Sequence, residues 1–285
     1  MRPSFNLFHW LRQGLHHVMA WSVTAVFLLP LFWLFVVSLR QPGLPPPATI
    51  EWWPTAPHWS NYQTIFTIVP LQRHLLNSAL VVAVAVPVTL LVASLAGFAL
   101  SQLPRRSQRR LFILSLAVIL VPGAAVWLLR FQILQALGLI DSLWALIVPA
   151  FTASNPLFVL LYYRASRQIP GELVEAARLE GGTAVTIWRR IIWPLSSATG
   201  TAVVVLSFVM YWSDFIGPVL YIYNSRLYTI PVGVQLLKQL DATNWPLLMA
   251  ASLVMTAPSI LVFLLSQNKF LPDLLDFPIH KSSKS

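Results

Sequence analysis

The chain contains no cysteine and few charged residues. Only 10% of its 285 residues are charged, whereas a soluble domain usually has about 25%. Without cysteine the chain forms no disulfide, no thiolate metal site and no cysteine redox centre. None of the six histidines has the spacing of a zinc-binding motif. The sequence therefore predicts no metal site, no cofactor bound by this chain and no catalysis by this chain alone.

Hydrophobic residues make up 57% of the sequence and recur in long runs. A helix needs about 20 mostly apolar residues to cross a bilayer. The runs therefore predict an all-α, polytopic membrane protein with six transmembrane helices, and most of these contain a proline that should kink them. We expect the helices at 18–39, 76–100, 111–130, 143–163, 196–222 and 247–267.

The order of these segments predicts one membrane domain. A short segment at 1–17 precedes the first transmembrane helix at 18–39, which is too long and too late in the chain for a signal peptide. A Pro-rich loop at 40–74 leads into the membrane domain at 75–268, which contains a charged loop at 164–195. The chain ends in a tail at 269–285.

Lysine and arginine fall unequally on the two sides that six helices define. Because short cytoplasmic loops are enriched in these residues, the richer side is expected to be cytoplasmic, with both termini on it. This topology accounts for the net charge of +10 without any nucleic-acid partner. The richer side holds Arg2, Arg12, Arg105, Arg106, Arg109, Arg110, Arg164, Arg167, Arg178, Arg189, Arg190, Lys269, Lys281 and Lys284, and the other side holds Arg40, Arg73, Arg130, Arg226 and Lys238.

The charged loop is predicted to form a helix, a turn and a second helix. Pro170 can begin a helix at about 171–180, and Glu172 favours the positive end of that helix. Gly181 and Gly182 should end it, because glycine adopts the left-handed turn at low cost. Thr183 is then a suitable N-cap for the second helix.

The second helix of the loop has one apolar face. Its pattern predicts packing against the bundle or the membrane surface. The first helix is small, and its alanines leave a low flank that another surface can approach. The pattern fits either a helix that docks on a partner protein or one that lies at the membrane interface. The apolar face consists of Ala184, Ile187, Trp188, Ile191, Ile192 and Leu195.

Specific residues in this loop carry a family resemblance. In "VEAARLEGGTAVTIWRRIIWP" (174–194), Glu175-Ala176-Ala177, Gly181, Ile191 and Pro194 match, in identity and spacing, the EAA motif. The loop thus resembles that of permeases of ATP-binding-cassette importers. Two positions depart from the usual pattern, since Glu180 replaces Asp and Trp193 replaces Leu.

The resemblance covers most of the chain and narrows to one group. "NYQTIF" (61–66), "YWSDFIGPVLYI" (211–222) and "LYTIPVGV" (227–234) are similar to carbohydrate importers of the maltose and glycerol-phosphate type, and within them to the second permease subunit. The tail "LPDLLDFPIHKSSKS" departs from the family pattern, so no role is carried over to it.

This resemblance implies a type I importer permease fold in a bacterial inner membrane. The implied partners are a second, similar permease, an ATPase dimer that binds the ATP, a periplasmic or lipid-anchored solute-binding protein and the surrounding lipid. The motif residues Glu175, Ala176, Ala177, Arg178, Glu180, Gly181, Ile191 and Pro194 would form the ATPase-docking loop. Glu175 is expected to pair with a basic ATPase residue, the alanines to allow close packing, and Gly181 to set the angle of the turn.

Two polar residues within expected helices are candidates for the translocation path. Asp214 falls within 196–222, where an ionisable side chain is costly and usually functional. It could equally hold neighbouring helices together. Asn155, before Pro156, could line the path or satisfy backbone groups that the proline leaves free.

The tryptophans of the first loop also allow two interpretations. Trp52, Trp53 and Trp59 could stack on a sugar or form part of the aromatic belt at the membrane interface.

Other functions remain as alternatives. A permease of the same class could carry a non-sugar solute such as a polyamine or phosphate. An ion-coupled secondary transporter usually shows repeats and several charges within the membrane, whereas Asp214 is the only acid well inside an expected helix. A membrane enzyme would need a cluster of catalytic acids or histidines, which the sequence lacks.

Overall fold

The structure is a computed structural model, and it describes residues 7–49, 51–152 and 155–267 of the chain, with side chains from residue 14 onward. Every regular element in this part of the chain is a helix, which confirms the all-α prediction. The expected tail at 269–285 lies outside the described residues. The same is true of the start of the expected N-terminal segment at 1–17, including Arg2, and the side chains of that segment are described only from residue 14.

The helices fall into two compact units. One consists of Met1–Val69 and Val234–Val254, and the other of Pro70–Gly233 and Met255–Ser285. Two helices, α13 (Ile230–Leu240) and α14 (Trp245–Ser266), belong partly to each unit.

The first unit contains α1 (Leu7–Ser38) and α2 (Asn61–Ile68). A fully buried asparagine, Asn61, joins the end of α1 to the start of α2. Its Nδ2 donates to the carbonyl oxygens of Ser38 and Arg40, each at 2.8 Å. Because an unpaired buried backbone carbonyl is costly, this single side chain fixes the chain where it leaves α1.

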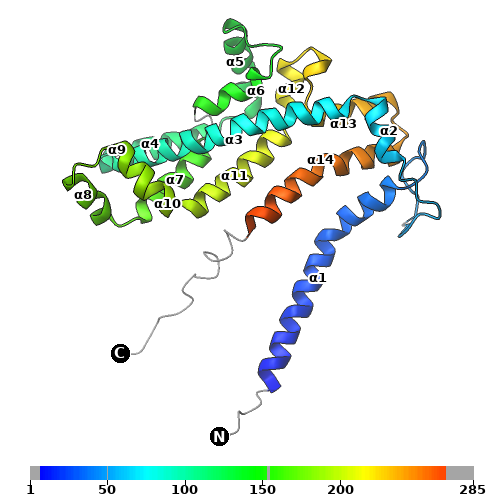
Figure 1. Cartoon of the computed structure of the whole chain (residues 1–285), viewed down its shortest axis with the longest axis horizontal. Helices are drawn as coiled ribbons and strands as arrows, with labels where there is room; N and C mark the ends of the chain where they lie inside the picture. The colour runs from blue at the N-terminus through cyan, green and yellow to red at the C-terminus, as the bar shows by residue number, and fades with distance from the viewer. Residues whose placement is uncertain (1–6, 50, 153–154, 268–285) are drawn as a thin grey trace. The chain divides into compact units, whose positions relative to one another are not determined.

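The second unit is built around α3 (Leu71–Gln102), which packs against α7 (Pro156–Gln168) and α11 (Ser197–Trp212) (Figure 1). Gly97 of α3 lies at the contact with α7. A Cβ at this position would be 2.5 Å from Tyr162 Cβ and 2.7 Å from the backbone nitrogen of Tyr163. The two helices therefore approach each other at a distance that only glycine permits.

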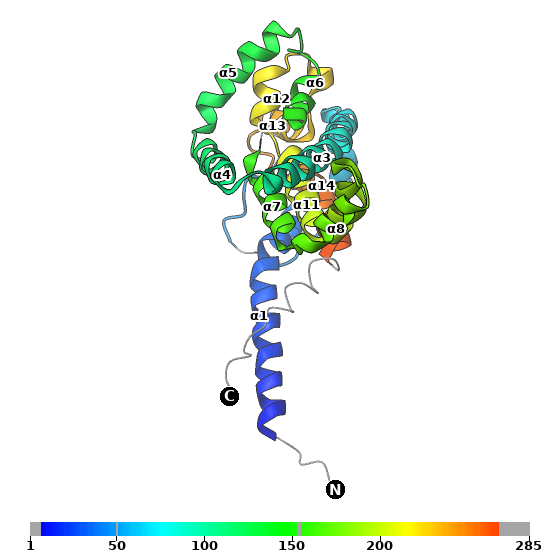
Figure 2. The same ribbon diagram turned by 90° about the vertical axis from the view of Figure 1, so that its left-hand side faces the viewer.

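The third expected transmembrane helix, 111–130, is broken in the structure. Instead α4 (Arg105–Ile119) and α5 (Gly123–Ala136) meet at an angle of 96°, a bend visible in Figure 2. Pro122 lies between them, and proline both lacks an N–H donor and disfavours helical geometry at the residue before it. A bend was expected at this proline, but the break is much sharper than a kink.

The fourth and fifth expected helices are also interrupted. The stretch 143–163 contains α6 (Trp144–Ile147), the 3₁₀ turn η1 (Val148–Thr152) and the start of α7. The stretch 196–222 contains α11, which ends at Trp212, and then α12 (Ile216–Tyr221). Asp214 therefore lies in the gap between α11 and α12. The sequence had predicted that it lies within a helix, and this prediction is wrong.

The number of apolar helices agrees with the membrane prediction. Among the described residues, four stretches are long and apolar enough to cross a bilayer, and two further bent pairs raise the number to six if each pair counts as one span. The second bent pair joins the helix that begins at Ala184 to α11 at an angle of 81°. The remaining elements are η3 (Ser225–Leu227) and the helices of the charged loop, described next.

Candidate functional site

The charged loop begins with α8 (Gly171–Leu179), close to the helix expected at 171–180. Two hydrogen bonds close its C-terminal end. Gly181 N donates to the carbonyl of Arg178 at 3.0 Å, and Gly182 N donates to the carbonyl of Ala177 at 2.8 Å. This pair of bonds is the Schellman motif, which requires a left-handed residue just after the helix.

The two glycines of this turn have different reasons to be glycine. Gly181 has a φ of +81°, although a Cβ there would meet nothing within 4 Å. Gly182 has an ordinary φ, but its Cβ would lie 2.6 Å from the carbonyl oxygen of Ala177. The expectation of a left-handed turn at Gly181 is therefore met, and Gly182 adds a steric requirement that the motif comparison did not identify.

The second helix of the loop begins at Thr183, as its sequence predicted. The Thr183 hydroxyl accepts a hydrogen bond from the backbone nitrogen of Thr186 at 3.2 Å. The chain then continues through α9 (Ala184–Ile187), the π-helical turn η2 (Trp188–Ile192) and the short α10 (Trp193–Leu195). A π-helical turn contains an extra residue, so the apolar stripe shifts along its length. Ile187 and Ile192, five residues apart across this turn, are both buried, whereas Ala184 and Leu195, expected on the same face, are exposed.

An apolar cluster connects the loop to the membrane helices. Phe98 of α3, Val174 of α8, Ile187 and Ile192 form its buried centre. The indole rings of Trp188 and Trp193 meet edge to face nearby, with ring centroids 5.2 Å apart. Trp193, which replaces the usual leucine, therefore makes an aromatic contact that leucine could not make.

Two of the eight motif residues face inward, and the others are exposed. Ala177 and Ile191 pack against the apolar cluster. Arg178 donates a hydrogen bond through Nη2 to Gln102 Oε1 at the end of α3. Three of these eight residues thus hold α8 and the following helix in place. The exposed members are Glu175, Ala176, Arg178, Glu180, Gly181 and Pro194, and of these Arg178 has the bond to α3.

Leu179 is an additional residue on the exposed surface of α8. Its side chain is 90% exposed, although leucine is usually buried. It lies next to Glu180 and one turn after Glu175. The sequence signal was an apolar residue among charged ones at the end of a short helix, and the motif comparison had not included it.

Asp214 has both a structural bond and a place on a cavity wall. Its Oδ1 accepts a hydrogen bond from Gly217 N at 3.0 Å, which satisfies a free donor at the start of α12. It also lines a cavity of about 190 Å³ together with Arg130 and Tyr211. The bond is local to the start of α12 and does not join neighbouring helices, so Asp214 caps α12 while its place on the cavity wall leaves a role in the path as a prediction.

Asn155 has a clear role at the start of α7. Its Oδ1 accepts a hydrogen bond from Leu157 N at 3.1 Å, and Pro156 occupies the first helical position. This is an N-cap followed by proline, a common way to begin a helix. Its Nδ2 donates to Met210 Sδ at 3.4 Å, which ties α7 to α11.

Comparison with known proteins identifies the family. A model of the family described as "Binding-protein-dependent transport system inner membrane component" matches residues 89–275, which include α8, the glycine turn and Asp214. The chain belongs to this family. It is therefore a permease, a multi-pass inner-membrane component of a binding-protein-dependent importer.

Several curated permeases are similar over most of their length. The sulfoquinovosyl glycerol transport system permease protein of Agrobacterium fabrum is 30% identical, and the match covers 87% of each chain. The trehalose/maltose transport system permease protein of Thermococcus litoralis is 28% identical over 84% of this chain and 87% of its own. The lactose transport system permease protein of Rhizobium radiobacter is 27% identical over 76% of this chain and 79% of its own.

A solved structure confirms the importer permease fold. It is the crystal structure of a bacterial ABC transporter involved in the import of the acidic polysaccharide alginate. The match has a TM-score of 0.71 and covers 94% of this chain and 100% of the other, at 17% sequence identity. At this identity the likeness concerns the fold.

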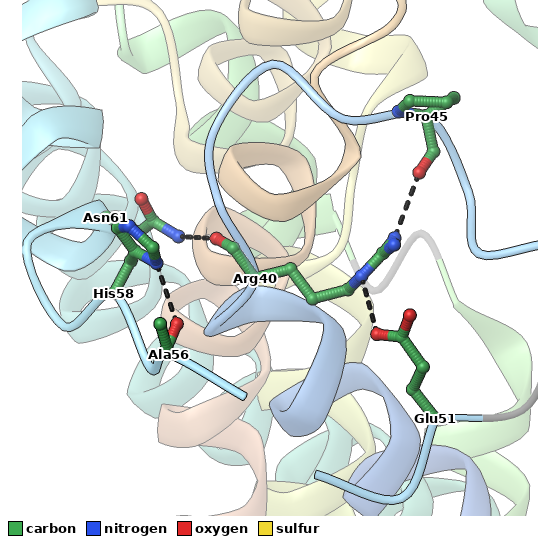
Figure 3. Close-up of polar contacts among 6 residues, drawn as sticks. All are labelled: Arg40, Pro45, Glu51, Ala56, His58 and Asn61. Atoms are coloured by element: carbon green, nitrogen blue, oxygen red, sulfur yellow. Dashed lines mark hydrogen bonds and ion pairs between the residues drawn. The ribbon is translucent and has the colours of Figure 1, made fainter. Parts of the chain in front are cut away.

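Polar contacts also hold the segment between α1 and α2 (Figure 3). Arg40 forms an ion pair with Glu51 at 3.0 Å and donates from Nη1 to the carbonyl of Pro45 at 3.1 Å. The ring N–H at His58 Nδ1 can donate to the carbonyl of Ala56 at 2.8 Å. Together with the bonds of Asn61, these contacts hold a segment that has little regular structure.

The three tryptophans of this segment, for which the sequence allowed two roles, are largely exposed. Trp52, Trp53 and Trp59 are 62%, 54% and 57% exposed. Trp53 and Trp59 both lie beside Phe35 of α1, with ring centroids 6.4 and 6.0 Å away. Exposed rings at the end of a membrane helix fit an interface belt as well as a sugar-stacking surface.

Proposed function

We propose that this permease is one of two similar permease subunits of an ATP-driven importer for a sugar or related carbohydrate. Its partners are a second permease, an ATPase dimer that binds the ATP, and a periplasmic or lipid-anchored solute-binding protein. The names of the related permeases support the substrate class, since they include lactose, trehalose/maltose and arabinooligosaccharide transport systems.

The ATPase docks on α8. The observation that carries this step is an exposed, nine-residue helix whose end is fixed by a left-handed glycine and whose surface presents Leu179 beside Glu175 and Glu180. An exposed leucine next to carboxylates suits a groove that is apolar at its floor and basic at its rim. Glu175 pairs there with a basic ATPase residue, and Ala176 allows close approach.

The way α8 is held explains how movement of the ATPase would reach the membrane helices. The Schellman turn and the Arg178–Gln102 hydrogen bond fix α8 to the second helix of the loop and to α3. The apolar cluster around Phe98 and Ile187 fills the space between them. Packed clusters of this kind transmit displacement because they are nearly incompressible. A push on α8 would therefore move α3 and α11 together, and the chain would convert motion without hydrolysing ATP.

The charge pattern sets the proposed orientation. Loops expected on the same side as α8 hold most of the arginines, so α8, the N-terminus and the C-terminus are cytoplasmic. The ATPases lie on that side, and the segment around Arg40 and Glu51 faces the solute-binding protein.

Uptake by the reconstituted importer tests this function. Proteoliposomes that contain both permeases and the ATPase, supplied with the binding protein, should take up trehalose, lactose or arabinobiose only when ATP is present inside. Uptake of spermidine or phosphate in place of any sugar would assign the permease to another solute class. Solute uptake by this chain alone, driven by an ion gradient without ATP, would contradict the proposal.

A further inference from the structure

The cavity beside Asp214 contains an arginine and an acid that do not form an ion pair. It measures about 190 Å³ and lies between α5, α6, α11 and α12. Arg130 is the arginine, and it is half-buried. No ion pair within 4.0 Å joins it to Asp214, and no hydrogen bond of its guanidinium occurs among the described residues.

Two opposite charges that line one small cavity without touching each other leave room for a ligand between the two side chains. Arg130 offers only hydrogen-bond donors, and the Asp214 carboxylate offers only acceptors. A sugar hydroxyl can accept from one and donate to the other, so two neighbouring hydroxyls satisfy both side chains. A carboxylate or phosphate ligand would be attracted by Arg130 but repelled by Asp214, and a polyamine would meet the reverse problem.

The rest of the cavity wall suits the same ligand. Tyr211 and Tyr221 contribute aromatic rings, and both hydroxyls already have partners, in Thr89 Oγ1 at 3.1 Å and the Trp127 carbonyl at 3.2 Å. Their positions are therefore fixed independently of any ligand. Pockets for drug-sized ligands usually measure about 300–1,000 Å³. At about 190 Å³ this cavity is smaller, so it suits a ligand smaller than a drug, such as a single sugar ring.

We propose that Arg130 and Asp214 form a sugar subsite, in which a neutral, hydroxyl-bearing ring is held between the guanidinium and the carboxylate. The ring belongs to a monosaccharide or to one unit of a longer saccharide. This inference rests on the proposed carbohydrate function and adds the place in this chain where the substrate is bound.

Protection of an introduced thiol tests the subsite directly. Because the chain contains no cysteine, Met210→Cys places a single thiol in it, on the cavity wall beside Asp214. The complete complex is placed in lipid nanodiscs and treated with a maleimide, and labelling of this chain is followed on a denaturing gel. Trehalose, lactose or arabinobiose, whichever the importer transports, should slow the labelling at saturation, whereas spermidine should not.

Two further variants distinguish the subsite from a general effect of the sugar. Adding Arg130→Gln should raise the half-protecting sugar concentration about 10- to 100-fold, as expected for the loss of hydrogen bonds to a charged group. Adding Arg226→Gln, an exposed arginine outside the cavity, should leave it unchanged. Arg130→Gln also removes no hydrogen bond within the described part of the chain, so the variant should fold.

The outcomes separate this proposal from the broader one. If the importer takes up a sugar but that sugar does not protect the thiol, or protects it equally in Arg130→Gln, the subsite is wrong and the proposed function stands. If the importer transports no sugar, the proposed function fails and the subsite fails with it.

Discussion

Replacing Gly181 by valine should release α8 from its fixed position. At a φ of +81° any residue with a Cβ is strained by about 1–2 kcal/mol, and a β-branched residue is strained further. A nine-residue helix is too short to be stable by itself. A cost of about 2 kcal/mol lowers the ratio of folded to unfolded α8 by up to about 30-fold.

Hydrogen exchange measures this effect at the helix itself. In nanodiscs, amides of α8 should exchange faster in Gly181→Val than in the wild type, and less ATPase should copurify. Gly171→Val is the matched control, because Gly171 begins the same helix and a Cβ there would meet nothing within 4 Å. Thr183→Ala removes the N-cap and an exposed bond to the Thr186 hydroxyl, at a cost of about 1 kcal/mol for the cap, and should be milder. Exchange and ATPase recovery in Gly181→Val equal to those of Gly171→Val would refute the argument.

Three further changes test the packing and hydrogen bonds within each unit. Gly97→Ala should lower the midpoint of thermal unfolding, because overpacking costs about 1–3 kcal/mol where α3 meets α7, whereas Gly14→Ala, with open space around it, should not; equal midpoints would contradict the close approach. Asn61→Ala should destabilise by about 1–3 kcal/mol, since the carbonyls of Ser38 and Arg40 lose their donor, and an unchanged midpoint would argue against this role. Arg40→Gln should speed proteolysis between α1 and α2 more than Glu51→Gln, because Arg40 also bonds the carbonyl of Pro45. The ion pair alone, in which Glu51 is 42% exposed, contributes about 1 kcal/mol; the opposite order would show that the ion pair dominates.

Local signals in the sequence were sufficient for the turn of the charged loop. Gly181, Gly182 and Thr183 each act through the backbone within a few residues, so their identity predicts the Schellman turn and the N-cap without tertiary contacts. Asn155 before Pro156 is also a local signal, but it was expected inside a continuous helix at 143–163, so its role as the N-cap of α7 was not predicted. The direction in which each side chain of α8 points depends on α3, and the sequence therefore could not show that Ala177 packs inward or that Arg178 bonds Gln102.

Breaks within the apolar segments were less predictable. Proline predicts a bend, but its size depends on the helices packed around it, as the 96° angle between α4 and α5 shows. The end of α11 before Asp214 was missed because hydrophobicity continues through Phe215 and Ile216. The cavity next to Asp214 joins residues from four separate helices, so no local pattern could bring Arg130 to it.

The most direct test of the account is whether Glu175 is needed for the ATPase to bind. The tagged permease is extracted in mild detergent, and copurifying proteins are quantified by mass spectrometry for the wild type, Glu175→Lys and Glu172→Lys. Glu172 lies one turn earlier, where a carboxylate favours the helix N-terminus, so its reversal controls for loss of helix stability. The account predicts that the second permease is retained in all three and that the ATPase is depleted only from Glu175→Lys. Equal ATPase recovery from the wild type and Glu175→Lys would contradict docking through α8.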